Sequence, residues 1–101
     1  MKLERIAWTG ASTLDAGELR RQLEAEGFDV WSWSDQPDAD YQPHTHDHDE
    51  SLWVVAGEIV FGAEGRVFRL GPGDRLMLPQ GTVHTARAGT AGATYLVGEK
   101  R

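Results

Sequence analysis

Cysteine is absent from this sequence of 101 residues. Its absence excludes disulfide bonds, thiolate metal ligands and a thiol nucleophile together. Without a thiolate, a soft ion such as Cu(I) is disfavoured. A metal site in this chain would depend on histidine nitrogen and carboxylate oxygen instead.

Long apolar runs are also missing. The longest, from Leu52 to Ala56, is far too short to cross a bilayer. The first residues, MKLERIAWTGAS, include the charged Lys2, Glu4 and Arg5 and lack the apolar segment of a signal peptide. We therefore expect a cytoplasmic protein with no membrane partner.

Basic residues are few and scattered. There are 10 Lys and Arg against 16 Asp and Glu, which gives a net charge of −6. Nucleic-acid-binding domains usually carry a basic patch, so nucleic acid is not an expected partner. The apolar content of 40% and the charged content of 26% are typical of a soluble globular protein. The length predicts a single domain over residues 1–101.

A helix is predicted near the N-terminus. Residues 14–26 contain good helix formers and one thin stripe of leucines. Ser12 and Thr13 offer N-cap oxygens, and Asp15 would lie in the first turn, where a negative charge suits the helix dipole. Gly27 is a natural residue to close this helix. We expect it to lie across the surface of a sheet.

The rest of the chain is dominated by short strands. Residues 3–8 predict an edge strand, and further strands are expected near residues 28–33, 41–46, 51–56, 58–62, 66–70, 75–78, 83–87 and 93–99. The 12 glycines suit many tight turns. This pattern predicts a mainly-β sandwich or barrel over about residues 28–99, after a strand and helix over about 1–27.

Three histidines and one glutamate are candidate metal ligands. His44 and His46 are two residues apart, so in a strand their side chains point the same way. His84 lies in a different predicted strand, and Glu50 begins the one after the histidine pair. Three imidazoles and a carboxylate are a complete protein ligand set for a divalent transition metal. The alternation that points Glu50 inward predicts Trp53 on the outer side, under the helix or at an interface.

Two segments resemble the two sequence motifs of the cupin superfamily. The first motif, G-x5-H-x-H-x3,4-E-x6-G, and the second, G-x5-P-x-G-x2-H-x3-N, match at His44, His46, Glu50, Gly57, Gly73, Pro79, Gly81 and His84. Asp38 stands where the first motif begins with glycine, and Ala88 where the second ends with asparagine. Neither position is a metal ligand in the family, so the ligand set stays complete. The two departures would change only the local turn and the surroundings of the ligands.

The resemblance covers about half of the chain and is closest to small single-domain bacterial cupins with the conserved type-2 barrel. It implies a double-stranded β-helix, or jelly-roll, barrel with one N-terminal helix. It also implies one divalent metal per chain, held by His44, His46, Glu50 and His84. The ion would be Fe, Mn, Ni, Co or Zn.

Several residues near these ligands leave alternatives open. His48 has the same strand alternation as His44 and Glu50, so a regular strand would point it inward as well. In the cupin family this position is free and the chain usually bends here. We therefore expect His48 at the rim and Glu50 as the ligand. The acids Asp35, Asp38 and Asp40 are interpreted as a solvated loop. A different role is open to Asp47 and Asp49, which are candidates for fixing the tautomer of a histidine.

Aromatic and apolar side chains are candidates for a pocket wall. The aromatic ones lie in or beside predicted strands, and for each the alternative is a plain core or interface contact: Trp31, Trp33, Tyr41, Trp53 and Phe61. Met77 and Leu78 precede the Pro-Gln-Gly turn and are further candidates. Arg87 has the opposite alternation to His84 and is not assigned to the site.

Three functional classes fit this pattern. An octahedral metal with four protein ligands keeps two open positions, which suits a dioxygenase or an isomerase acting on a small oxygen-rich molecule. A module that binds a metal or a small ligand without turnover, such as a sensor, is the alternative. A barrel whose histidines take up adventitious zinc is the third. The sequence identifies neither a substrate nor catalytic residues.

The predicted edge strands lead to a prediction about assembly. Residues 3–8 and 28–33 would leave backbone groups and apolar side chains open to a twofold mate, and cupins are commonly dimers. We expect a homodimer at micromolar concentration. Light scattering measures the mass directly, and a monomeric mass would contradict this expectation.

Overall fold

A computed structural model of the chain describes residues 1–10 and 13–100. The described part forms seven strands and one helix. In chain order these are β1 (Glu4–Ile6), α1 (Ala16–Ala25), β2 (Asp29–Asp35), β3 (Asp40–His44), β4 (Asp49–Ala63), β5 (Arg66–Leu70), β6 (Arg75–Leu78) and β7 (His84–Lys100). This architecture confirms the predicted mainly-β barrel with one N-terminal helix. No helix in the described ranges has the length and apolar character needed to span a bilayer.

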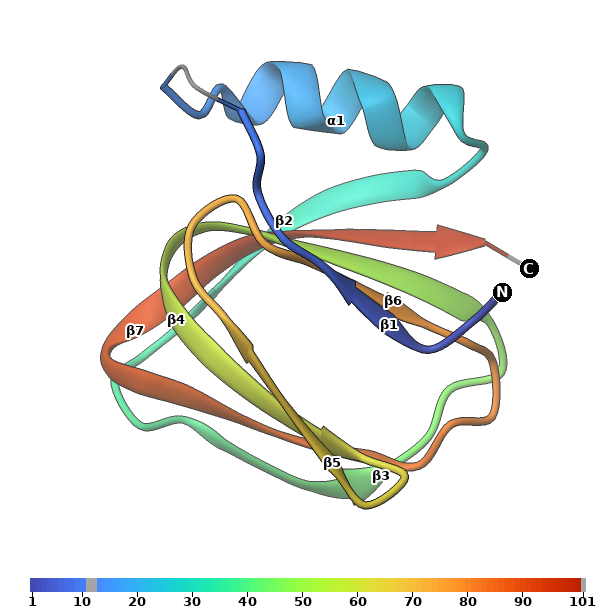
Figure 1. The fold of residues 1–101 in the computed structure, drawn as a ribbon, viewed down its shortest axis with the longest axis vertical. Helices are drawn as coiled ribbons and strands as arrows, with labels where there is room; N and C mark the ends of the chain where they lie inside the picture. The colour runs from blue at the N-terminus through green and yellow to red at the C-terminus, as the bar shows by residue number, and fades with distance from the viewer. Residues whose placement is uncertain (11–12, 101) are drawn as a thin grey trace.

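Two long bent strands, β4 and β7, hold the barrel together. They pair with each other along almost their whole length, from Asp49 opposite Lys100 to Ala63 opposite His84. One layer contains the first part of β4 and the last part of β7, flanked by β6, β1 and β2. The other contains their remaining parts, flanked by β5 and β3. The layers join where β4 and β7 bend, and the loops after β3 and β6 cross the opposite side (Figure 1).

Four predicted strands merge into two. The segments expected near 51–56 and 58–62 are one strand, β4, and those near 83–87 and 93–99 are one strand, β7. The expected break at Gly57 is wrong because pairing with β7 continues through register shifts on either side of it. A bulge bends a strand without ending it. The glycine therefore marks a bend between the two layers.

Gly57 lies where β4 and β7 cross most closely. Its φ is 76°, and a Cβ added there would lie 2.2 Å from the carbonyl oxygen of Gly92. Only a residue without a side chain fits so close to another backbone. Position 38, where the resembled motif has glycine, also adopts a positive φ, of 60°, at Asp38. Aspartate tolerates this conformation better than most residues, which explains how the turn survives the departure from the motif.

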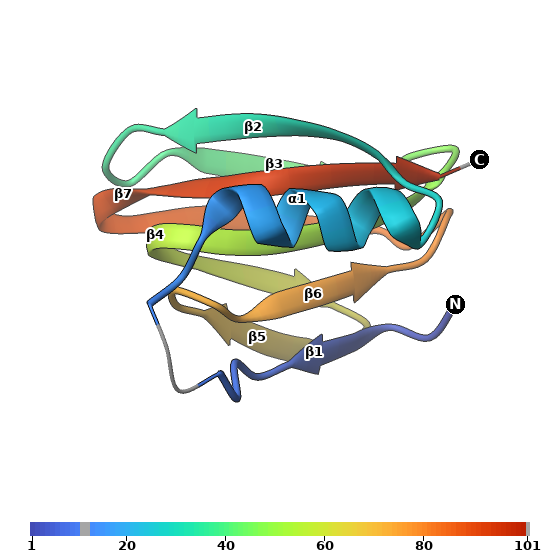
Figure 2. The ribbon, with the colours of Figure 1, turned by 90° about the horizontal axis from the view of Figure 1, so that it is seen from above.

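Alternation along β4 divides the apolar residues into two clusters. Leu52 and Val54 point between the layers, into the inner cluster that also contains Phe61 and Tyr95. Trp53 points outward and packs in a second cluster, whose buried members are Leu19, Leu23, Phe28, Trp53 and Leu96. The helix covers this outer cluster (Figure 2). The predicted position of Trp53 under the helix is confirmed.

The helix begins later than predicted. Its N-cap is Asp15, whose Oδ1 accepts hydrogen bonds from the backbone N–H groups of Gly17 (2.9 Å) and Glu18 (3.4 Å). Thr13 precedes the helix, and Ser12 lies outside the described residues. A carboxylate aimed at the first free N–H groups is a strong cap, which accounts for the later start. The predicted end is confirmed, because Gly27 has a φ of 97° in a Schellman motif.

Arg75 fastens the end of the helix to the sheet. Its side chain is buried and donates to Ser51 Oγ at 2.6 Å and to the carboxylate of Glu26. The guanidinium also lies 4.7 Å from the ring centroid of Trp53. The hydrogen bond with Arg75 holds the pKa of the Glu26 carboxyl below its ordinary value. A buried cation with these partners ties α1, β4 and β6 into one unit.

A pair of glycine substitutions tests the crossing of β4 and β7. Gly57→Ala forces a methyl group against a backbone carbonyl, and Gly65→Ala introduces the same side chain at a similar φ, 71°, where nothing lies within 4 Å. Both changes cost about 1–2 kcal/mol of backbone strain, and Gly57→Ala costs a further ~1–3 kcal/mol from overpacking. Urea unfolding followed by circular dichroism measures the difference. Equal losses for the two variants would contradict the crossing.

Candidate metal centre

Three histidines converge between the two layers of the barrel. His44 is the last residue of β3, His84 is the first residue of β7, and the two are register partners. His46 comes from the loop after β3, beyond the strand in which it was expected. The ring centroids of His44 and His84 are 4.2 Å apart, and that of His46 lies 5.0 and 5.2 Å from them. One ring nitrogen from each of the three lies within 4.8 Å of the others.

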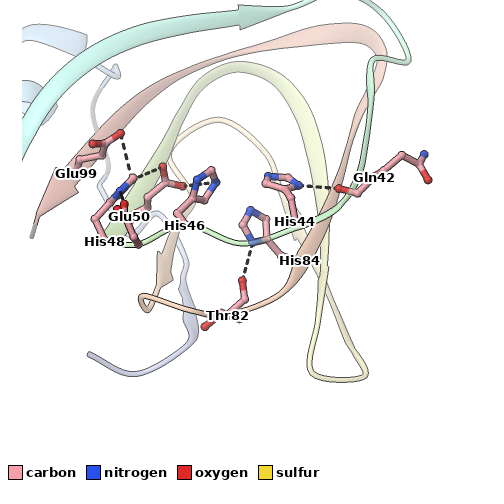
Figure 3. A network of polar contacts seen from close by, with 9 residues as sticks. Gln42, His44, His46, His48, Glu50, Thr82, His84 and Glu99 are labelled. Carbon is pink, nitrogen blue, oxygen red and sulfur yellow. Dashed lines mark hydrogen bonds and ion pairs between the residues drawn. The ribbon is translucent and has the colours of Figure 1, made fainter.

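Backbone carbonyls fix the orientation of two of these rings. Nδ1 of His44 lies 2.7 Å from the carbonyl oxygen of Gln42, and Nδ1 of His84 lies 2.9 Å from that of Thr82 (Figure 3). A carbonyl only accepts, so each Nδ1 must carry the hydrogen. In the neutral form of each ring, Nε2 then carries the free electron pair. Metal-binding histidines usually donate their other N–H to a carbonyl or carboxylate in this way.

Burial keeps His84 in the form that binds metals. Its side chain is buried, and desolvation, the largest cause, lowers the pKa of His84 below its ordinary value. The nearby His44 and His46 lower it further, against an opposing hydrogen bond to Thr82. A lowered pKa favours the neutral imidazole near neutral pH. Only that form offers an electron pair to a cation.

Glu50 lies beside the histidines and faces two ways. It is buried near the start of β4, with Oε1 3.7 Å from Nε2 of His46 and Oε2 3.2 Å from Nε2 of His48. The structure therefore brings His44, His46 and His84 into one group and places Glu50 in a second group with His46 and His48. The four predicted ligands are neighbours, and their role in metal binding stays a prediction.

His48 differs from the expectation. It was expected at the rim, but only 6% of it is exposed. Nδ1 lies 3.1 Å from Asp47, and Nε2 lies 3.1 Å from Glu99 Oε2 in addition to its contact with Glu50. Sequence analysis did not find Glu99, which is opposite Glu50 only because of the β4–β7 register. Of the two acids considered as histidine partners, Asp47 contacts His48, whereas Asp49 accepts from the backbone N–H of Gln80 at 2.8 Å.

A pocket of about 280 Å³ opens beside the histidines. Its lining combines the candidate ligands with aromatic and apolar side chains from both layers: Trp31, Trp33, Tyr41, His44, His46, Glu50, Leu52, Phe61, His84, Ala86, Tyr95, Val97 and Glu99. Four of the five predicted aromatic residues belong to this wall, and Trp53 does not. Among the described residues that form the lining, none is lysine or arginine. Arg87 is outside it, as expected.

Met77 and Leu78 are not part of this pocket, contrary to expectation. Leu78 is 2% exposed and packs in the inner core, and Met77 packs against the outer cluster under the helix. The sulfur of Met77 accepts a hydrogen bond from Ser51 Oγ at 3.4 Å. The prediction used proximity to the Pro-Gln-Gly turn alone. The register of β6 against β4 decides which way these side chains point.

The sequence model of the Cupin domain family matches residues 31–97. This chain is a cupin. KdgF from Halomonas sp. is 31% identical, with a TM-score of 0.61 over 71% of this chain and 68% of that one. An RmlC-like cupin from Shewanella frigidimarina is 23% identical, with a TM-score of 0.63 over 73% and 67% of the two chains.

A third solved structure is similar over the whole chain. A DUF861 family protein from Thermotoga maritima covers 98% of this cupin and 100% of its own length, with a TM-score of 0.66 and 14% identity. At this identity and at that of the RmlC-like cupin, the likeness shows the fold alone. No curated protein matches the sequence.

A second polar cluster supports the aromatic wall of the cupin pocket. The carboxylate of Asp35, the last residue of β2, accepts hydrogen bonds from Trp33 Nε1 (2.9 Å), Tyr41 Oη (2.5 Å) and Tyr95 Oη (2.7 Å). Burial, and then the bond to Asp35, raises the pKa of both tyrosines. Asp35 is therefore not the solvated loop acid that was expected. It fixes three side chains of the pocket lining at their polar ends.

The contribution of Asp35 can be measured with a double-mutant cycle. Asp35→Ala leaves the hydroxyl of the buried Tyr95 without its acceptor, which costs about 1–3 kcal/mol of unfolding free energy. Combined with Tyr95→Phe, the cycle should give a coupling energy of about 0.5–3 kcal/mol from urea unfolding. Ser34→Ala serves as the control, because Ser34 is an exposed residue of the same strand that bonds to Thr94, and it should change stability by less than ~0.5 kcal/mol. A coupling energy near zero would show that the contact does not position the wall.

Proposed function

We propose that this cupin binds one divalent transition metal through His44, His46, His84 and Glu50, next to a pocket that accepts a small oxygen-rich molecule. The observation that carries the proposal is the convergence of three imidazoles, two of them held by carbonyls so that Nε2 is free. Nitrogen and oxygen donors of this kind suit Fe(II), Mn(II), Ni(II), Co(II) or Zn(II). Such an ion would act as a Lewis acid and orient ligand oxygens.

The pocket gives the proposed metal a setting for chemistry. Phe61 and Leu52 form part of a largely apolar wall close to the histidines. Apolar surroundings lower the local dielectric constant, which strengthens electrostatic interactions. Glu99, the carboxylate of the lining that is not assigned to the metal, can accept a proton from a ligand. We therefore favour a metal-dependent dioxygenase or isomerase. This proposal follows from the site itself, since the fold alone does not determine a reaction.

A ligand-binding module without turnover is the second candidate. The observation that favours this candidate is that several polar groups of the pocket are already hydrogen-bonded or ion-paired to other side chains. Glu50 and Glu99 share His48, and the hydroxyls of Tyr41 and Tyr95 are bonded to Asp35. A catalytic base needs to reach the proton that it removes. If these contacts persist with a ligand bound, the site would recognise the ligand and leave it unchanged.

Metal analysis tests the shared part of both candidates. We expect untagged protein, prepared without added zinc, to take up about one ion per chain, as a mononuclear site would. Loss of a residue that only hydrogen-bonds to a metal ligand lowers metal affinity by ~10–100-fold. His84→Ala should lower the affinity for the metal by more than this, because it removes a ligand itself. Thr85→Ala is the control, since Thr85 is the exposed neighbour of His84. Equal binding by these two variants would contradict the proposed site.

Turnover separates the two candidates. Protein loaded with Fe(II) or Mn(II) would be incubated with a panel of small diols, hydroxy acids and keto acids while oxygen uptake and product formation are followed. Conversion that is lost in His84→Ala supports the enzyme. A thermal shift with a panel member and no conversion supports the binding module.

A further inference from the structure

His48 has a carboxylate on each side of its ring. Nδ1 lies 3.1 Å from Asp47 Oδ1, and Nε2 lies 3.2 Å from Glu50 Oε2 and 3.1 Å from Glu99 Oε2. Figure 3 shows the ring of His48 between Glu50 and Glu99, on the side of Glu50 away from His44 and His84. His48 is therefore outside the three-histidine group but in contact with the carboxylate next to it.

The partners of His48 determine where its hydrogens are. An ionised carboxylate only accepts, so each ring nitrogen must carry a hydrogen for these contacts to be attractive. The Nε2–H group then donates to Glu50 and Glu99 at once. Without His48, these two carboxylates would face each other across paired strands with no N–H donor between them.

We propose that His48, fixed by Asp47 and Glu99, is the positioning residue of Glu50, holding Oε2 so that only Oε1 is offered to the metal centre. This inference rests on the proposed metal-binding function. The backbone of Glu50 is fixed by pairing on both sides, with Leu78 in β6 and Glu99 in β7. What remains adjustable is the rotation of its carboxylate, and the contact with His48 restrains it.

Glu99 makes this restraint independent of Glu50. Its side chain, 22% exposed, lies on the pocket side of His48 and keeps a carboxylate on Nε2 even if Glu50 moves. An imidazole that stays in place can return Glu50 to one orientation after each ligand exchange. A carboxylate that presents one oxygen occupies one coordination position, whereas a bidentate one occupies two. His48 would thereby keep a second position available for a ligand.

Variants at His48 separate positioning from packing. His48→Leu removes the donor at similar volume, and His48→Gln keeps an N–H donor that reaches Glu50. Glu58→Gln is the matched control, because Glu58 is an exposed carboxylate of β4, the strand of Glu50, and its ion pair among the described residues is with Arg69 at 4.0 Å. Co(II) is the probe. Its affinity is measured by competition with a chelator, and its visible absorption at saturation reports the coordination number.

We expect His48→Leu to weaken Co(II) binding by about 10–100-fold and to change the visible band. His48→Gln should restore most of the affinity and the wild-type band, and Glu99→Gln should show a smaller loss in the same direction. Urea unfolding of the metal-free variants checks that they fold. If His48→Leu does not fold, the comparison of Glu99→Gln with Glu58→Gln carries the test.

Two outcomes would overturn the inference, and they are distinguishable. If wild-type protein binds Co(II) and His84→Ala does not, while His48→Leu keeps the wild-type affinity and band, only the positioning role of His48 is wrong. If wild-type protein does not bind Co(II), Mn(II), Fe(II), Ni(II) or Zn(II), the proposed function and this inference fail together.

Discussion

The antiparallel pairing of β4 with β7 is the constraint on which the rest of the molecule depends. These two strands pass through both layers, so their register fixes the inner core, the outer cluster and the candidate site together. Glu50 lies near the start of β4, and His84 and Glu99 lie near opposite ends of β7. A shift of one residue would turn each of these side chains to the other face. The register shifts on either side of Gly57 let the two layers fold over each other while the pairing continues.

Charge is distributed unevenly around the histidines. Toward β3, Nδ1 of His44 and Nδ1 of His84 each face a carbonyl oxygen, and burial lowers the pKa of His84. Toward the last part of β7, the ring of His48 contacts three carboxylates, and their hydrogen bonds and charges raise its pKa against the opposing effect of burial. Environment alone can thus shift the pKa values of chemically identical side chains in opposite directions. Glu50 lies at the boundary between these two surroundings.

Much of the site could be predicted from local spacing, and the rest depends on register. His44, His46, Glu50 and His84 follow from their intervals and from the cupin motifs, and the outward position of Trp53 follows from alternation. Glu99 and the contact of Asp35 with Tyr95 could not be found in this way, because each joins strands that are distant in the sequence. The merging of predicted strands at Gly57 and the misplaced Met77 have the same origin. Turn residues mark a change of direction, and only long-range pairing decides whether a strand ends there.

The pocket lining described above, without lysine or arginine, has a thermodynamic consequence. A ligand that carries negative charge would find no fixed positive side chain there, so its counter-charge would have to come from an ion on the histidines. Uptake of such an anion and occupancy by that ion would then be linked, each tightening the other by the same factor. An uncharged ligand, held by aromatic side chains of the lining such as Trp31 and Trp33, would show far weaker linkage. The electrostatics of the cavity would then make the affinity for anions depend on the metal.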